Sequence, residues 1–276
     1  MTAGLTLRDL RAADLTAAHR LTQAMSWPHR LEDWWLMQEF GSGLVAVDGT
    51  DEILGTVLWW PFDAEAAMLG MVLVPAAQQG KGIGRALMQA AMAQAAPRAL
   101  MLYSTAAGQR LYASLGFRAI GAIRQHQGRL AAPLPASGPA RPFKAADRAA
   151  LLALDAAAFG APRTALLDRL LRIGEAAVLE APGGIAGFAI RRAAGRGETI
   201  GPIVAASEAD AGALIAALSA PGLLRVDIPA DATRLASWLG EIGLPCVDAG
   251  TAMVRGNWPE RSQAPRSFAL VSQALG

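Results

Sequence analysis

MVLVPAAQQGKGIGRAL, residues 71–87, is the stretch of this sequence that says most about its fold. An apolar run typical of a buried strand ends at Pro75, and a glycine-rich segment then leads into an alanine-rich helical pattern. Glycines 80, 82 and 84 let the backbone turn tightly and approach a ligand closely. Free N–H groups at the start of the helix then point to one spot, as in phosphate sites. The stretch predicts a strand, a phosphate-binding loop and a helix.

Two well-known phosphate-binding motifs do not match this loop. In a P-loop the first position is glycine and Gly-Lys precedes Ser or Thr, whereas here Pro75 holds that position and Gly82 follows Lys81. A dinucleotide-binding loop has a third glycine where Arg85 stands and an acidic residue after the next strand, and residues 100–103 offer none. A dehydrogenase or nucleotide hydrolase therefore rests on glycine content alone.

The spacing of Gln79, Gly82 and Gly84 resembles the Gln/Arg-x-x-Gly-x-Gly/Ala loop of the GCN5-related N-acetyltransferase (GNAT) family, which also has an apolar strand before it. About thirty residues downstream, residues 106–117 (AAGQRLYASLGF) resemble the family's A-x-x-L-Y-x-x-L-G-F signature. Because both motifs occur in the family's order, the chain is identified as a GNAT member. It is similar to bacterial two-domain acetyltransferases with a degenerate second copy.

The resemblance implies that the fourth and fifth strands run parallel and splay apart, with the pantetheine arm of acetyl-CoA between them. The backbone N–H near Val72 is then expected to polarise the thioester carbonyl, and backbone groups around Leu73 and Val74 to pair with the pantetheine amides. The residues expected to hold the pyrophosphate or lie beside it are Gln79, Gly80, Lys81, Gly82, Ile83, Gly84 and Arg85. Acetyl-CoA is the implied cosubstrate, and no metal is expected.

A phenol at the start of the second motif's helix can protonate the departing thiolate of CoA. Tyr112 occupies the position that the resembled family uses for this acid, and Tyr103 is a poorer choice because it stands inside a predicted strand. The base that deprotonates an ammonium acceptor stays open among a chain of water molecules and the side chains of Glu65, His29, Glu32 and Asp33.

Aromatic residues crowd the first half of the chain, and core packing is the ordinary explanation for them. Trp59 and Trp60 are adjacent in a predicted strand, so they face opposite sides of the sheet, and one is expected outside the main core. An acceptor site with aromatic walls is the alternative, since Trp rings attract cations. The residues assigned to acceptor binding are Trp27, Trp59 and Glu65.

The two halves of the chain read as diverged copies of one unit. Residues 8–14 (RDLRAAD) match residues 141–147 (RPFKAAD), and the strand pattern at 53–58 (ILGTVL) matches that at 185–190 (IAGFAI). The prediction is an α/β (α+β) protein with tandem GNAT-like domains, each a mixed, mostly antiparallel sheet with helices on both faces.

Residues 1–131 are predicted to form the catalytic domain that binds acetyl-CoA, residues 132–140 a linker rich in Pro, Gly and Ser, and residues 141–276 the degenerate domain. The second copy has no glycine triplet, and the segment 207–212 carries two carboxylates that would repel a pyrophosphate. We therefore expect it to bind no CoA and to wall the acceptor site. Residues considered for this wall, without an argument to choose among them, are Phe188, Thr199, Gly201, Pro202, Asp227, Met253 and Arg255.

Bulk properties argue against several partners. The net charge is +2 with no run of Lys and Arg, so no nucleic-acid partner is expected. One cysteine, Cys246, and three scattered histidines give no disulfide framework and no metal-ligand spacing. Early charges and the lack of a long apolar stretch predict neither a signal peptide nor a membrane segment. A cytoplasmic monomer or homodimer is expected.

Together these patterns predict an acyltransferase, specifically an acetyl-CoA-dependent N-acetyltransferase. It would move an acetyl group to the amine of an unidentified small-molecule acceptor by direct attack on the thioester. The alternative is a non-catalytic acyl-CoA-binding sensor or regulatory module, which the degenerate copy and the lack of an evident base suggest.

Overall fold

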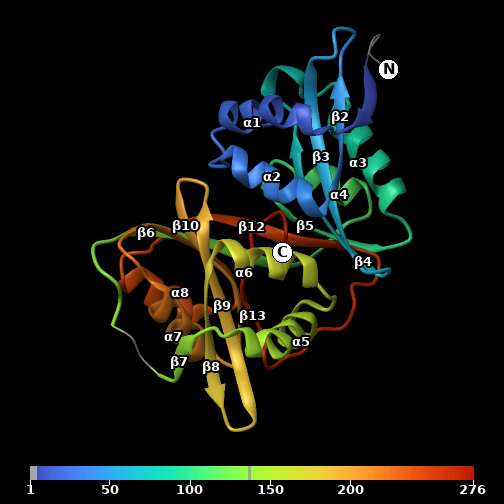
Figure 1. Ribbon diagram of the computed structural model, residues 1–276. Helices are drawn as coiled ribbons and strands as arrows, with labels where there is room; N and C mark the ends of the chain where they lie inside the picture. The colour runs from blue at the N-terminus through green and yellow to red at the C-terminus, as the bar shows by residue number, and fades with distance from the viewer. Residues whose placement is uncertain (1–4, 136–137) are drawn as a thin grey trace.

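The computed structural model describes residues 5–135 and 138–276, and in these residues all thirteen strands belong to one sheet (Figure 1). The first half contributes β1 (Thr6–Asp9), α1 (Leu15–Ala24), α2 (Leu31–Phe40), β2 (Ser42–Val47), β3 (Ile53–Phe62), β4 (Ala66–Leu73), α3 (Ile83–Ala95), β5 (Ala99–Ser104), α4 (Gln109–Ser114) and β6 (Arg118–Leu130). Short 3-10 helices lie at Ala12–Asp14, Ala76–Gln78 and Ala145–Asp147.

The second half repeats this order of elements. It contributes β7 (Ala140–Pro142), α5 (Arg148–Phe159), α6 (Thr164–Ile173), β8 (Glu175–Ala181), β9 (Gly184–Ala194), β10 (Gly197–Ala205), α7 (Glu208–Leu218), β11 (Gly222–Pro229), α8 (Thr233–Glu241) and β12 (Cys246–Arg255), followed by an additional strand, β13 (Arg266–Ala269). The repeat predicted from the sequence is thus present element by element.

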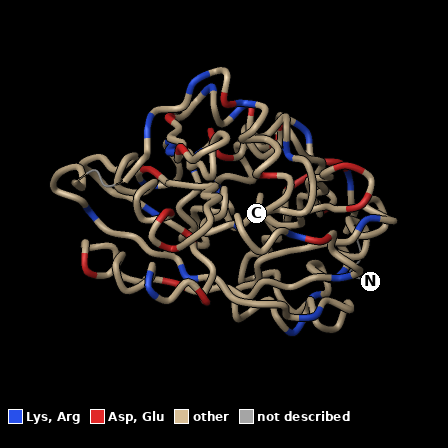
Figure 2. The backbone as a smooth tube through the Cα atoms, turned by 90° about the horizontal axis from the view of Figure 1, so that it is seen from below, with Lys and Arg blue, Asp and Glu red and all other residues tan. Residues whose placement is uncertain are grey.

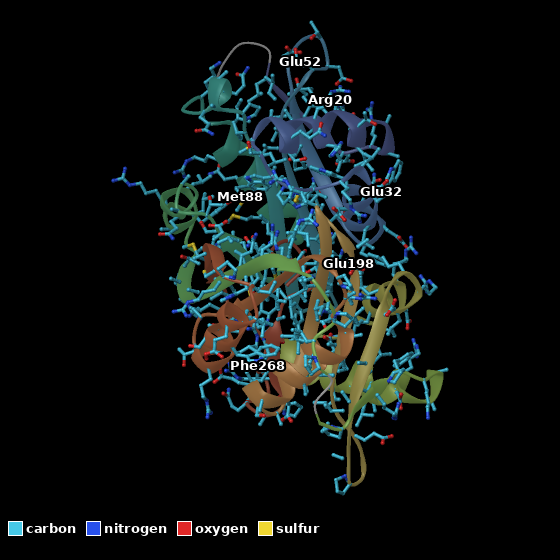
Figure 3. The ribbon with its side chains drawn as sticks, turned by 90° about the vertical axis from the view of Figure 1, so that its left-hand side faces the viewer. Arg20, Glu32, Glu52, Met88, Glu198 and Phe268 are labelled. Atoms are coloured by element: carbon cyan, nitrogen blue, oxygen red, sulfur yellow. The ribbon has the colours of Figure 1, made fainter. Side chains whose placement is uncertain are left out.

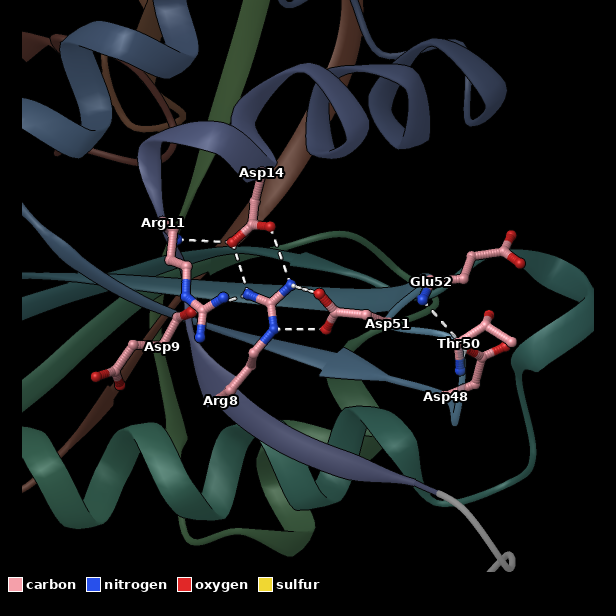
Figure 4. A network of polar contacts seen from close by, with 8 residues as sticks. All are labelled: Arg8, Asp9, Arg11, Asp14, Asp48, Thr50, Asp51 and Glu52. Atoms are coloured by element: carbon pink, nitrogen blue, oxygen red, sulfur yellow. Dashed lines mark hydrogen bonds and ion pairs between the residues drawn. The ribbon is translucent and has the colours of Figure 1, made fainter.

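An arginine at the start of each half makes the same hydrogen bonds, so the repeat extends to side-chain contacts. The Arg8 guanidinium donates to both carboxylate oxygens of Asp14, at 2.7 and 3.0 Å, and also contacts Asp51 (Figure 4). In the second half Arg141 donates to both oxygens of Asp147, again at 2.7 and 3.0 Å. Each of these aspartates also accepts a hydrogen bond from the backbone three residues earlier, which fixes the start of the helix.

The two halves exchange strands in the middle of the sheet, which the sequence did not predict. The strand order is β1-β2-β3-β4-β5-β12-β6-β11-β10-β9-β8-β7, so β12 of the second half lies between β5 and β6 of the first. In turn β6 lies between β12 and β11. The predicted domain boundary at residues 132–140 stays a prediction, and residues 136 and 137 lie outside the described residues.

Helices cover both faces of the sheet, as predicted, and they bury both tryptophans of β3. α1 and α2 pack on one face of the first half and α3 and α4 on the other (Figure 1). Trp60 lies in a core that joins α1 and α2 to α5 and α6 of the second half, and Trp59 lies under α3. The two rings thus face opposite sides of the sheet, as predicted, and Trp59 lies outside the core that holds Trp60, but both are buried because helices cover each face.

Charged side chains are dispersed over the molecule. In the view of Figure 2, basic and acidic positions are spread over the backbone trace and do not gather into one patch. No helix in the described residues is long and apolar enough to cross a membrane.

Candidate active site

β4 and β5 open a gap in the first half of the sheet. They are parallel neighbours that pair at only three positions, the last being Met68 with Met101. β4 continues to Leu73 and β5 to Ser104, so their backbones separate beyond Met68. Separating strands leave N–H and C=O groups without ladder partners, and an amide-containing ligand can pair with such groups.

A β-bulge lies at the point where the gap opens. Met71 and Val72 of β4 together oppose one residue of β3, because the register shifts between Thr56 and Leu58. Met71 has a φ of 51°, in the left-handed region that bulky side chains rarely adopt. The Thr56 hydroxyl donates to the Met71 carbonyl at 2.7 Å and holds the bulge in place. The extra residue of a bulge is left out of the ladder, so backbone groups here are free for a ligand.

The segment between β4 and α3 has the open backbone that the sequence predicted. Gly80 and Gly82 have φ values of 77° and 83°, and a Cβ on either would meet no described atom within 4 Å. Glycine is therefore required here by backbone conformation, and the space in front of the loop is open. Gly82 caps α3, whose first-turn N–H groups have no partner within the helix. This end of the gap suits a diphosphate, and the residues present fit CoA.

Side chains around this loop hold its shape. Gln79 donates to the Val74 carbonyl at 3.0 Å, which ties the loop to the end of the gap. Lys81 donates to Gln78 at 2.8 Å and is exposed, while Ile83 is buried and anchors α3 in the core. The residues on either side of the glycines therefore hold the loop in its conformation.

α4 is attached to the first turn of α3. Arg85 donates to the Ser114 hydroxyl at 2.8 Å, and a Cβ on Gly84 would lie 3.4 Å from Leu111. Tyr112 is therefore held beside the loop, in the core that contains Phe117. Burial raises the pKa of Tyr112 to about 12, so its phenol is protonated at neutral pH and able to donate a hydrogen bond.

A central cavity of about 190 Å³ lies where the two halves meet, on the other side of the bulge. Gly70 and Met71 line it, so the cavity reaches the place where the gap opens. The other first-half residues that line it are Trp27, Pro28, His29, Asp33, Leu36, Met37, Tyr103, Thr105, Gln125 and Gln127. The second half contributes Arg192, Ala194, Gly195, Arg196, Gly197, Glu198, Thr199, Leu223, Arg225, Asp227, Asp248 and the segment 271–275. Figure 3 shows Glu198 at the level where the two halves join.

The β9–β10 hairpin of the second half reaches the first half beside this cavity (Figure 1). The Gly195 N–H donates to Asp33 at 2.9 Å, and Arg30 donates both to Asp33 and to the Ala193 carbonyl. These bonds lower the pKa of Asp33 although burial opposes them, so Asp33 is an engaged carboxylate and a poor base.

His29 is the neutral nitrogen base of the cavity. Its Nδ1 is buried and has no hydrogen-bond partner among the described residues. Burial lowers the pKa of His29 to about 4, so the imidazole is uncharged at neutral pH and keeps a lone pair free.

The structure brings together only part of the acceptor site that the sequence predicted. Trp27 lines the central cavity. Trp59 is 5% exposed under α3 and packs there, so our proposal for the acceptor site does not include it. Glu65 is exposed at the β3–β4 turn, at the closed end of the strand pair, about 20 Å along β4 from Met71. Exposed Glu32 does not line the cavity either.

Of the second-half residues considered for the wall, Thr199 and Asp227 line the cavity. Phe188 is wholly buried, and Met253 packs into the first-half core because β12 pairs with β5 there.

Sequence reasoning missed several polar residues of the cavity. Gln125 and Gln127 come from the exchanged strand β6, and no local pattern gave their position. Arg192 did leave a signal, because Phe188, Ile190 and Arg192 occupy alternate positions and therefore share one face of β9. An arginine that continues a buried apolar face calls for an explanation.

The matching gap of the second half is closed. β10 and β11 pair at only two positions, as Glu198 with Leu224 and Thr199 with Arg225. β13 then runs antiparallel to β10 and fills the place where the two strands separate. A Cβ on Gly201 would clash with the Leu270 carbonyl, which shows how closely the backbones approach.

Comparisons with known proteins agree with this geometry. Models of the acetyltransferase (GNAT) domain match residues 39–119 and residues 151–266. A protein of Bacillus subtilis (strain 168) named uncharacterized N-acetyltransferase YitH is 30% identical over 219 residues, which cover 75% of this chain and 76% of that protein. The chain belongs to the GNAT acetyltransferase family. It is therefore an acyltransferase with two GNAT domains in tandem.

Solved structures show the same fold. A putative acetyltransferase from Pyrococcus horikoshii superposes with a TM-score of 0.81 at 20% identity, over 100% of this chain and 97% of that chain. A tandem GNAT protein from the clavulanic acid biosynthesis pathway gives 0.64 at 16% identity, over 91% of this chain and 98% of that chain. Among the described residues of this GNAT protein, no group of His, Cys, Asp and Glu is arranged to hold a metal ion.

Proposed function

We propose that this chain transfers an acetyl group from acetyl-CoA to the amine of a small molecule bound in the central cavity. The observation that carries the proposal is the β4 bulge at Met71 and Val72. It lies between the open loop on one side of the sheet and the cavity on the other. Acetyl-CoA bound with its diphosphate at the loop would place its thioester at this bulge. An amine in the cavity would then approach the thioester from the opposite side.

The coenzyme's contribution would be a thioester that is already activated toward an amine. The loop amides and the first turn of α3 would bind the diphosphate, and the unpaired edges of β4 and β5 would hold the amide-containing arm. Free backbone N–H groups at the bulge would stabilise the charge that develops on the carbonyl oxygen. Because Thr56 fixes the bulge, these donors are in place before the reaction starts.

Tyr112 would stabilise the departing thiolate. A thiol has a pKa near 8.5, roughly three units below that of this buried phenol, so a hydrogen bond is favoured over complete proton transfer. On the acceptor side, we assign the lone pair of His29 to accept a hydrogen bond from an amine that is already uncharged, because a pKa of about 4 makes His29 too weak a base to deprotonate an ammonium group. The two groups lie on opposite sides of the sheet, as the two halves of the reaction require.

The experiment that tests the proposal is turnover with acetyl-CoA and a library of small amines, measured as release of free thiol. We expect turnover with at least one amine class and, by calorimetry, binding of CoA to the free protein. Binding of CoA without turnover of any amine would favour an acyl-CoA sensor. Failure to bind CoA would overturn the proposal altogether.

A further inference from the structure

Arg192 is a cavity residue that the proposed reaction does not use. It continues the buried face of β9 and is 5% exposed. Its two terminal nitrogens donate to the carbonyls of Ala193, at 3.3 Å, and Val271, at 3.0 Å. Its Nε is buried and has no partner among the described residues. The guanidinium therefore has contacts that position it but no counterion among the described residues.

Three of the four acids that line the cavity with Arg192 are already engaged elsewhere, and the fourth, Asp248, is exposed. Asp33 is bound by Arg30 and the Gly195 N–H, Glu198 by Arg191, and Asp227 by Arg225 at both oxygens. Burial lowers the pKa of Arg192 to about 10, which still leaves the group charged at neutral pH. A buried charge without a partner is strongly unfavourable for the folded state. An anionic ligand in the cavity would supply the missing partner.

Arg192 lies close to the place assigned to the acyl group. The segment 271–276 forms a tight turn in which the Val271 N–H donates to the Gly276 carbonyl. Val271 accepts from Arg192, while Ala274 packs on Gly70, where an added Cβ would lie 3.3 Å from the Ala274 Cα. Three chain steps join Val271 to Ala274, so at most about 11 Å separates their Cα atoms. One small molecule can therefore span from Arg192 to the bulge.

We propose that Arg192 binds a carboxylate of the acceptor, so that the substrates are small amines that also carry a carboxylate group. This inference rests on the proposed function and names its substrate class. The planar guanidinium donates parallel N–H bonds that match the two oxygens of a carboxylate. A phosphate carries close to two negative charges at neutral pH, whereas Arg192 supplies one positive charge, so a carboxylate is the better match. The cavity of about 190 Å³ is below the usual range of about 300–1,000 Å³ for drug-sized ligands, which suits a small acceptor.

The test compares matched acceptors at a fixed concentration of acetyl-CoA. Each set contains an amino carboxylate, its carboxamide and its phosphonate analogue, and kcat/KM is calculated on the concentration of neutral amine because the anionic group shifts the ammonium pKa. We expect kcat/KM for the carboxylate to exceed that for the carboxamide by about 10- to 100-fold, as for a lost hydrogen-bonded charge pair. A phosphonate preferred over the carboxylate, or a carboxamide used equally well, would overturn the inference.

Variants of Arg192 separate recognition from folding. Arg192→Met is expected to lose about 10- to 100-fold in kcat/KM on carboxylates and to keep the rate on carboxamides, while Arg192→Lys falls between. The melting temperature of Arg192→Met should equal or exceed that of the parent protein, because this variant removes an unpaired buried charge. Arg148→Met, which breaks an exposed pair with Asp168, is the control and should leave the acceptor preference unchanged.

Calorimetry with CoA distinguishes the two levels of the proposal. We expect the same affinity for CoA in Arg192→Met and in the parent protein. If CoA binds and amines are acetylated, but Arg192→Met keeps the full rate on carboxylates, the substrate inference fails and the proposed function stands. If the parent protein neither binds CoA nor acetylates any amine, the proposed function fails and the inference falls with it.

Discussion

The two halves of this acetyltransferase share one arrangement of strands and differ in what occupies a single gap. In the first half the separation of β4 and β5 stays open, next to a loop with two glycines in the left-handed region. In the second half the separation of β10 and β11 is filled by β13. There the turn into α7 is short, and Ser207 caps the helix by accepting from the Asp210 N–H. In the second half the chain itself pairs with the backbone groups of the separating strands, whereas in the first half the matching groups stay free for a ligand.

This difference teaches that a GNAT fold does not by itself make a CoA site. The backbone groups of unpaired strand edges need hydrogen-bond partners, and under the proposed function a segment of the same chain would compete with the coenzyme for them. We therefore expect one CoA per chain, bound by the first half.

The largest expected effect is on stability, from removing the side chain that anchors β13. Phe268 is 2% exposed and lies under the Arg266 guanidinium. Phe268→Ala should lower the free energy of unfolding by about 3–5 kcal/mol, measured by urea denaturation. The affinity for CoA should stay as in the parent protein, with one site by calorimetry. Phe117→Ala in the first half is the matched control, and it should lower turnover as well because Phe117 packs on Tyr112. A second CoA site in Phe268→Ala would contradict the comparison.

The next effect is on the open gap. Gly82→Glu should weaken CoA binding about 100-fold or more, because a carboxylate would face the diphosphate and the residue would be strained at a φ of 83°. Gly243→Glu has a similar φ of 90°, also with open space around it, and controls for strain and charge. Calorimetry should show parent-like affinity for Gly243→Glu. Equal affinity in Gly82→Glu would show that the loop is not the diphosphate site.

Phenylalanine variants of the two tyrosines test which side of the sheet supplies the acid. Tyr112→Phe should lower kcat about 100-fold and leave the KM for acetyl-CoA unchanged, as expected for a donor to developing charge. Because the pKa of Tyr112 is about 12, the parent protein's rate should show no decline from this group up to about pH 10. Tyr103→Phe, on the cavity side, should keep most of the rate. A reversed pattern would move the acid to Tyr103.

The smallest expected effect is on the pH dependence of stability, and it comes from His29 in the central cavity. The pKa of His29 is about 4 when folded and 6.5 when unfolded, so the unfolded chain binds more protons between these values. Stability should therefore fall as the pH drops from about 6.5 to 4, by about 2 kcal/mol at pH 5. His29→Gln should lack this part of the decline in urea denaturation at pH 7 and pH 5. Parallel curves for both proteins would mean that His29 is not buried.

The sequence by itself determined the loop, the repeat and the start of each half. Gly80 and Gly82 permit a positive φ that other residues resist, so their spacing predicts a tight turn before any tertiary contact is known. Arg8 and Asp14 are six residues apart, close enough for the sequence to imply the unit that Arg141 and Asp147 repeat. Such features follow from local geometry, which a linear pattern can encode.

Tertiary structure alone decided which gap stays open and what the cavity contains. β13 pairs with a strand about sixty residues earlier, and β12 pairs with a strand about 150 residues earlier. The sequence pattern of β3 and of the turn after it therefore could not show that Trp59 would be covered or that Glu65 would lie at the closed end of the gap. For Arg192, the sequence shows only an arginine on the apolar face of a strand. The tertiary structure shows that this face lines a cavity. Contacts between residues so far apart depend on the packing of the whole chain, because no local conformational preference specifies them.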